Sequence, residues 1–158
     1  MATPFTPATS PLGDHLTVTL HELVDRIDSI ADAALREHVG IGYSWFEFLA
    51  ILANNESDGH PDLTELASCL HVSKAAVSKR LPAFLEAGYV LAQPDPANAR
   101  RLVLRLTDEG RALVARSMPV LADAFESEVA GLPLDLGRLN AELTALVHHL
   151  DAPKGTAS

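Results

Sequence analysis

The sequence contains a single cysteine, Cys69, so no disulfide can form within one chain. Such sparing use of cysteine is typical of a reducing compartment, and we expect a cytoplasmic protein. Residues 1–10 lack the positive start and the apolar stretch of a secretory signal. The longest apolar run, Phe48–Ala53, is far too short to cross a bilayer, so no membrane partner is expected.

The motifs of enzymes and metalloproteins are also missing. Gly40-Ile41-Gly42 begins a dinucleotide-binding pattern but lacks the third glycine and a preceding strand. No G-x-S-x-G motif and no cysteine–histidine pairing is present. The histidines are scattered, and adjacent His148 and His149 point to different faces of a predicted helix. We therefore expect no catalytic activity, no metal and no cofactor.

Positive charge is scarce overall but concentrated in one place. The formal net charge is −9, from 12 basic and 21 acidic residues. Residues 71–106 nevertheless hold six basic and two acidic residues, whereas residues 1–70 hold two basic and eleven acidic ones. A local cationic patch attracts phosphate, and acidic surroundings oppose loose association elsewhere. Charge alone leaves two interpretations equally open, a nucleic-acid surface and an ordinary solvated face.

Two segments near the ends carry leucine-rich heptad seams. In a helix predicted over 12–37, apolar residues recur at steps of four and three: Leu16, Leu20, Leu23, Ile27, Ile30 and Ala34. A last helix over 135–150 repeats this spacing with Leu136, Leu139, Leu143, Leu146 and Leu150. Such seams are typical of helices packed lengthwise against another helix, either within one chain or between two copies.

Further helices are predicted between these segments. Ser44 is expected to cap a second helix, with Glu47 completing a capping box. Thr107 is expected to cap a helix that runs to about Ala130, with a kink at Pro119 and a buried stripe that includes Met118.

The middle of the chain predicts two helices joined by a three-residue turn. A short helix over 64–70 is followed by residues 71–73 and a second helix over 74–87, which Ser73 caps and Gly88 ends. The strand over 89–93, the loop over 94–101 and the strand that begins at Leu102 form a hairpin. Together these elements predict a winged helix-turn-helix.

The second helix of this pair presents two different faces. Val77, Leu81 and Leu85 form an inward stripe, while short or basic side chains occupy the opposite face near the start of the helix. Such a face fits the major groove and reads base edges, although a solvated amphipathic helix is the plainer alternative. Pro82 predicts either a kink, placed after the first turns of the helix that would contact the bases, or the end of the helix. The predicted DNA-binding residues are Ser73, Lys74, Ala75, Ser78, Lys79, Arg80, Arg100 and Arg101, the last two at the hairpin tip.

From residue 12 to residue 150 the chain resembles the MarR family of bacterial transcriptional regulators. The resemblance depends on LTELASCLHVSKAAVSKRLPAFLEAGYV and on DPANARRLVLRLTDEG, which matches the wing signature of the family at Asp95-Pro96, at Arg100 and at Leu106–Gly110. Asn98 stands where the family usually has an aspartate that pairs with an arginine and fixes the wing. Ala99 stands where arginine is frequent.

The resemblance implies a mainly helical fold with a small hairpin wing. It implies one domain over 11–150, with dimerisation helices 12–37 and 108–150 around a winged helix-turn-helix over 44–107, a flexible arm over 1–10 and a flexible tail over 151–158. It also implies a homodimer that binds double-stranded DNA at a pseudo-palindromic operator as a ligand-responsive repressor. An aromatic or phenolic effector would bind between dimerisation helices and wing, with His38, Tyr43, Trp45 and Arg100 as candidate lining residues.

Two alternatives to this function remain at the level of sequence. A winged-helix module can bind protein instead of DNA, although the charges Lys74, Lys79 and Arg80 against Glu86 alone favour DNA. Some relatives sense oxidants through a cysteine, and Cys69 is the residue that would serve here. Its place on the first helix of the pair predicts a buried, structural thiol. Trp45 is likewise expected more readily in the core than in a pocket.

Overall fold

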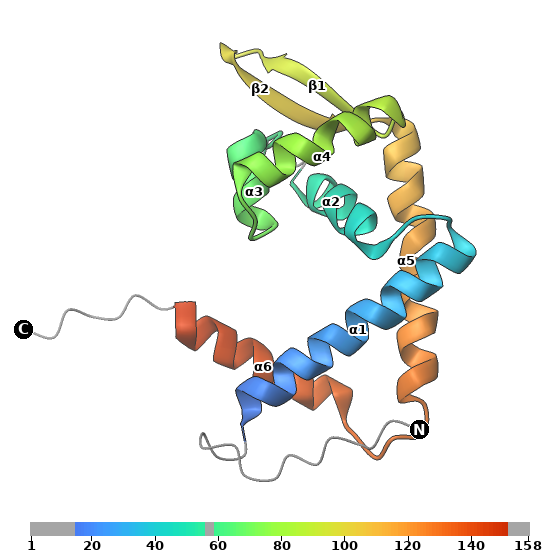
Figure 1. The fold of residues 1–158 in the computed structure, drawn as a ribbon. Coiled ribbons are helices and arrows are strands. Elements are labelled where there is room, and N and C mark those ends of the chain that lie inside the picture. The colour runs from blue at the N-terminus through green and yellow to red at the C-terminus, as the bar shows by residue number, and fades with distance from the viewer. Residues whose placement is uncertain (1–14, 56–58, 152–158) are drawn as a thin grey trace, which may run out of the picture. The chain divides into compact units, whose positions relative to one another are not determined.

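The computed structural model describes residues 15–55 and 59–151, and the chain divides into two units, residues 1–128 and 129–158. In order, the elements are α1 (Leu16–His38), α2 (Tyr43–Asn54), α3 (Leu63–Cys69), α4 (Lys74–Glu86), β1 (Val90–Asp95), β2 (Asn98–Leu106), α5 (Asp108–Val129) and α6 (Leu136–Asp151) (Figure 1). The mainly helical fold with a hairpin wing is confirmed. The predicted arm over 1–10 and residues 152–158 of the predicted tail lie outside the described residues.

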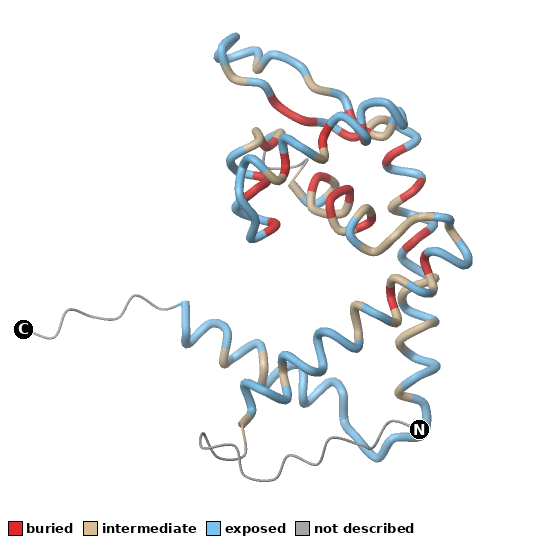
Figure 2. Tube along the Cα trace, viewed as in Figure 1, coloured by how far each residue is buried: buried red, intermediate tan, exposed pale blue. Residues whose placement is uncertain are grey.

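The first unit is built around a core in the helix-turn-helix region. Helices α2, α3 and α4 meet there, and Figure 2 shows buried positions on all three. The rings of Phe48 and Phe84 stack with centroids 4.0 Å apart. Val77 and Leu81 of α4 are buried as predicted, but Leu85 is 39% exposed. Phe84 takes the inward position, because it lies two helical turns, seven residues, after Val77 and so on the same face.

Helix α4 begins and continues as the sequence predicts. The hydroxyl of Ser73 accepts a hydrogen bond from the Ala76 amide at 3.1 Å, which is the predicted N-cap. The helix does not stop at Pro82 but runs to Glu86. Gly88 then adopts a φ of +75°, the left-handed conformation in which glycine commonly ends a helix.

Helix α2 does not begin with the cap that the sequence predicts. It begins at Tyr43, and Ser44 lies inside its first turn. The N-cap, Gly42, has no side chain to offer, so the carboxylate of Asp32 on α1 accepts the hydrogen bond from the Tyr43 amide at 2.8 Å. Arg36 holds that carboxylate through a 2.6 Å ion pair. Helix α1 therefore supplies the group that caps α2, and a local capping pattern could not show this.

The wing is a two-stranded antiparallel hairpin, and its turn is tighter than predicted. Asp95 pairs with Asn98, so the strands extend well into the predicted loop. The register shifts between Pro94 and Asp95, and residues 99–101 consequently bulge on β2 without a partner on β1. Val103 is buried, and the segment ending at Asp62 pairs beside it.

Helix α5 starts beside the residues that connect the end of α4 to the wing. The Thr107 hydroxyl donates a hydrogen bond to the Gly88 carbonyl and accepts one from the Gly110 amide, which confirms the predicted cap. Leu113 and Ser117 form the buried stripe, whereas Met118, predicted to belong to it, is 55% exposed.

The helices near the two ends of the chain keep apolar surface exposed. On α1, Leu16 is 56% and Leu23 is 41% exposed. The second unit contains α6, in which no residue is buried and Leu150 is 67% exposed. Among the described residues, no helix combines the length and the apolar character needed to cross a membrane.

Replacing Gly110 with alanine should destabilise the protein by about 1–3 kcal/mol, the usual cost of overpacking. A Cβ there would lie 2.3 Å from the Tyr89 carbonyl oxygen, so backbone must move. Chemical denaturation at fixed protein concentration measures the effect. Gly137→Ala in α6 is the control, because its Cβ would have only ordinary contacts. Equal stability of both variants would contradict the packing described here.

Candidate nucleic-acid interface

The start of α4 presents an exposed polar and cationic surface. Ser73, Lys74, Ala75, Ser78 and Lys79 are all exposed, while Val77 on the other side of the helix is buried. Ser78 and Lys79 lie one turn after Lys74 and Ala75, so these side chains share one face of the helix. We call Lys74, Ala75, Ser78 and Lys79 the recognition face. It combines small side chains with hydrogen-bonding and positively charged groups, the combination expected of a helix that enters the major groove.

The wing and the recognition face meet at a surface hollow. The hollow has a volume of about 450 Å³ and is lined by Asp62, Leu63, Lys74, Asn98, Arg100, Arg101 and Leu102. It brings Lys74 at the start of α4 together with Arg100 on β2. Arg100 lies in the bulge of β2 and not at the hairpin tip, which Pro96 and Ala97 form. The two cations predicted to act together therefore share one surface.

Arg80, predicted to contact DNA, lies on the inner side of α4. Its guanidinium donates a hydrogen bond to the Ser44 carbonyl at 2.6 Å, and its carbon Cζ lies 5.7 and 5.9 Å from the ring centroids of Phe48 and Phe84. It therefore fixes α4 against α2. The sequence contained a signal for this role, since position 80 lies three residues after buried Val77 and four before buried Phe84.

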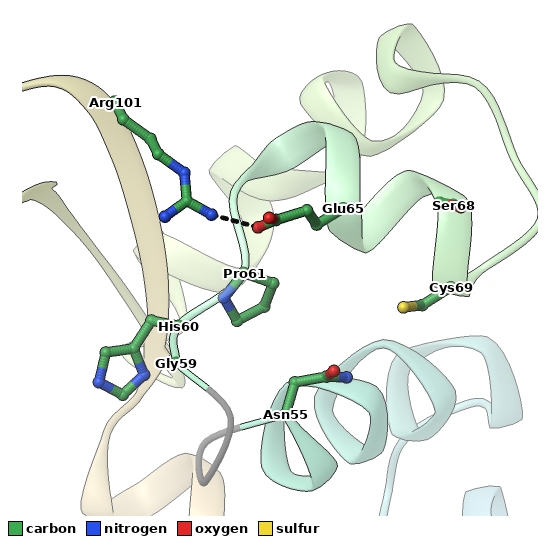
Figure 3. Close-up of a pocket in the computed structure, with 8 residues that line it drawn as sticks. All are labelled: Asn55, Gly59, His60, Pro61, Glu65, Ser68, Cys69 and Arg101. Carbon is green, nitrogen blue, oxygen red and sulfur yellow. Dashed lines mark hydrogen bonds and ion pairs between the residues drawn. The ribbon is translucent and has the colours of Figure 1, made fainter. Parts of the chain in front are cut away.

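Arg101 is also engaged within the protein. Its guanidinium bonds to Asp62 at 3.2 Å, to Asp95 at 2.8 Å and to Glu65 (Figure 3 shows the pair with Glu65). Asp62 and Glu65 form the capping box of α3, and Asp95 belongs to β1. We call these four residues the wing clamp, because they join the wing to the start of α3. Sequence reasoning missed the three carboxylates, although Asp62 and Glu65 have the spacing of a capping box.

The wing clamp favours the ionised forms of Asp95 and Asp62. The Arg101 guanidinium, followed by the Ala97 amide, keeps the pKa of Asp95 below its usual value. The pKa of Asp62 is lowered first by the backbone amide of Glu65 and then by Arg101. The same carboxylates raise the pKa of Arg101 further, so its charge is permanent. The clamp also fixes the wing although Asn98 stands at the position where MarR-family proteins usually have the aspartate that does so.

The four residues predicted to line an effector pocket lie in different environments. Trp45 packs in the core, with its ring 4.4 Å from that of Phe84. Tyr43 stacks on Phe46, and burial, followed by nearby carboxylates, raises the pKa of its phenol. His38 lines a separate hollow of about 410 Å³ with Ala34, Val120, Asp123, Ala124 and Ser127. Arg100 belongs to the hollow beside the wing, so these four residues do not form one pocket.

Cys69 is exposed, which corrects the prediction of a buried thiol. It lies at the end of α3 and lines a hollow of about 480 Å³ beside the wing clamp, with His60, Ser68 and Asn55 among its neighbours (Figure 3). The first helix of the pair turns its other side, bearing Leu66 and Ala67, to the core. In the described part of the chain, no cluster of three His, Cys, Asp or Glu side chains could hold a metal ion.

An exposed cationic helix set on a three-helix core, with a two-stranded wing beside it, defines a winged helix-turn-helix fold. The model of the MarR family matches residues 39–101, which cover α2, α3, α4 and most of the wing. An uncharacterised helix-turn-helix regulator of Bacillus subtilis, YvnA, is 46% identical over 50 residues, 32% of each chain, so the match spans about a third of that relative. Over residues 39–101 the chain is therefore similar to the MarR family.

Solved structures of the family have the same fold over most of this chain. Reduced MarR from E. coli superimposes with a TM-score of 0.72, 22% identity and coverage of 84% of this chain and 96% of MarR. The repressor CouR, solved on a 23-mer DNA duplex, gives 0.73 with 23% identity and coverage of 92% and 99%. BpsR of Bordetella bronchiseptica gives 0.70 with 20% identity and the same coverage. At these identities the likeness establishes the fold.

Arg101→Gln should lower the midpoint of thermal unfolding, because it leaves three carboxylates close together without their common cation. Arg100→Gln, a matched loss of charge one residue away, should leave the midpoint unchanged. Depressed carboxylate pKa values stabilise the fold above the unfolded-state pKa of about 4 and lose that effect as pH falls through the folded-state pKa. Melting curves from pH 7 to pH 3 should therefore converge for wild type and Arg101→Gln at the acid end, and parallel curves would contradict the clamp.

Proposed function

We propose that this protein binds double-stranded DNA sequence-specifically as a homodimer and acts as a ligand-responsive repressor at a pseudo-palindromic operator. The observation that carries the proposal is the exposed recognition face, with Lys74 and Arg100 lining one hollow. In this arrangement α4 enters the major groove, and the wing lies at the adjacent minor groove. Ser78 and Ala75 are suited to base edges, and Lys79 to guanine or phosphate.

The exposed apolar surface of the terminal helices supports the homodimer. Leu16 and Leu23 on α1 and Leu139 and Leu150 on α6 are between 38% and 67% exposed in the single chain. Seams of this kind are covered when helices of two chains pack lengthwise. A two-fold dimer places its recognition helices about 34–36 Å apart, so that they reach successive major grooves on one side of the duplex.

The distribution of charge favours DNA over a protein partner. Among the described residues, no ion pair engages Lys74, Lys79 or Arg100, so all three can meet phosphate. Binding to a folded protein does not require cations that lack an ionic partner. Binding to DNA uses them, because each phosphate that a cation neutralises releases condensed counterions. A steep fall of log affinity with log salt separates the two functions.

Lys79→Glu should weaken DNA binding by at least about a hundredfold, because a like charge then faces the phosphates. The measurement is a gel shift at several salt concentrations on duplexes that the purified protein selects from genomic fragments. Arg26→Glu on exposed α1 is the control with the same charge change, and sedimentation shows whether both variants remain dimers. Wild-type affinity in Lys79→Glu would refute the assignment of the recognition face.

Regulation by a small molecule is the second part of the proposal. BpsR is described as regulated in its DNA binding by 6-hydroxynicotinic acid. In this chain the hollow between α1 and α5 has a volume within the range of small-molecule sites, and His38 and Asp123 give it polar groups. The exposure of Cys69 beside the wing clamp favours one alternative, an oxidant as the signal.

Millimolar salicylate, an aromatic acid, should lower the affinity for the selected duplex. His38→Ala should raise the salicylate concentration needed by about tenfold, as expected for a lost charge-assisted contact, and should leave the affinity without salicylate unchanged. Hydrogen peroxide replaces salicylate in a second arm, with Cys69→Ser as the control. A response to peroxide that Cys69→Ser abolishes would favour the oxidant signal, and no response in either arm would refute ligand control of this kind.

A further inference from the structure

We infer that the hollow between α4 and the wing holds a single backbone phosphate of the DNA, which Lys74 and Arg100 bind together. The inference depends on the proposed function and specifies how one part of the interface acts. Its first support is position. A helix in the major groove and a wing at the adjacent minor groove are separated by one sugar-phosphate strand. A hollow lined by both elements therefore faces backbone and not base edges.

The second support is the charge of the lining. Asp62 and Arg101 both line the hollow, but they bond to each other within the wing clamp. In the part of the chain that the structure describes, Lys74 and Arg100 belong to no ion pair. The positive charge that remains available in the hollow thus comes from one side chain of α4 and one of β2.

The third support is Asn98, which lines the same hollow. Its side-chain oxygen accepts a hydrogen bond from the Arg100 amide at 3.2 Å, and this bond shapes the bulge that carries Arg100. An aspartate here would make the same bond but would present a negative charge to the phosphate. Because the clamp already fixes the wing through Asp95, asparagine can keep the turn and remove the repulsion.

Two cations on one phosphate have a measurable consequence. The slope of log affinity against log salt counts neutralised phosphates, at about 0.9 per phosphate on duplex DNA. If Lys74 and Arg100 share a phosphate, Lys74→Ala and Arg100→Ala each leave it neutralised by the other residue. Each variant should then bind about tenfold more weakly, as for loss of one charge-assisted hydrogen bond, with little change of slope. The double variant should lose about 0.9 of the slope.

The closing experiment measures these slopes by fluorescence anisotropy on the selected duplex. Both side chains are exposed, so melting curves should confirm that the variants fold. Lys79→Ala is the control, since Lys79 lies outside the hollow: its effect on the slope should add to that of either single variant. A duplex series with single methylphosphonates then locates the phosphate. One position per half-site should weaken wild-type binding but have no effect on the double variant.

The possible outcomes separate the inference from the proposed function. A wild-type protein that shows no salt-dependent DNA binding would remove the function itself. With DNA binding intact, slope losses of about 0.9 in each single variant would mean two separate phosphates and would overturn the inference. Loss of discrimination between A·T and G·C steps in Arg100→Ala would place this arginine in the minor groove and would also overturn it. Competition by inorganic phosphate at constant ionic strength would show that the hollow binds a free anion instead of the DNA backbone.

Discussion

The position of the wing depends on one guanidinium. Arg101 on β2 bonds to a carboxylate of β1 and to the two carboxylates that cap α3, so one side chain joins both strands of the hairpin to the helix-turn-helix. An isolated two-stranded hairpin is marginally stable in water. Here backbone pairing of the segment ending at Asp62 with Val103 adds to the side-chain contacts. The wing can therefore hold Arg100 at a fixed place relative to α4.

This arrangement divides the cationic side chains discussed for residues 71–106 into two groups with different roles. Arg80 and Arg101 are engaged inside the protein, where planar guanidinium groups suit stacking on rings and bonding to several oxygens. Lys74, Lys79 and Arg100 remain available for the proposed contacts with DNA. The proposed DNA-binding surface is thus smaller than the count of basic residues indicates. In the proposed complex, an acidic chain with few phosphate contacts would bind DNA weakly at random sites and would leave discrimination to the recognition face.

Several elements were predictable because their signals are local. Ser73, Gly88 and Thr107 act on backbone groups within a few residues, and capping chemistry of this range can be read from neighbouring letters. The same local pattern failed at Ser44 and Glu47, because the carboxylate of Asp32, eleven residues before Tyr43, supplies the cap instead. Capping patterns show which neighbouring side chains can cap a helix, but not whether a distant side chain accepts the hydrogen bond instead.

The sequence by itself determined the order of the elements, the winged helix-turn-helix and the exposed face that carries Lys74 and Lys79, since periodicity and helix ends are local properties of the chain. Only the tertiary structure decided which arginines are free. Arg100 and Arg101 are neighbours of the same type, and nothing in their order separates them. The bulge in β2 and the carboxylates of Asp62 and Glu65, more than thirty residues away, engage one and leave the other exposed. Contacts of this kind depend on folded distance, which a local pattern does not contain.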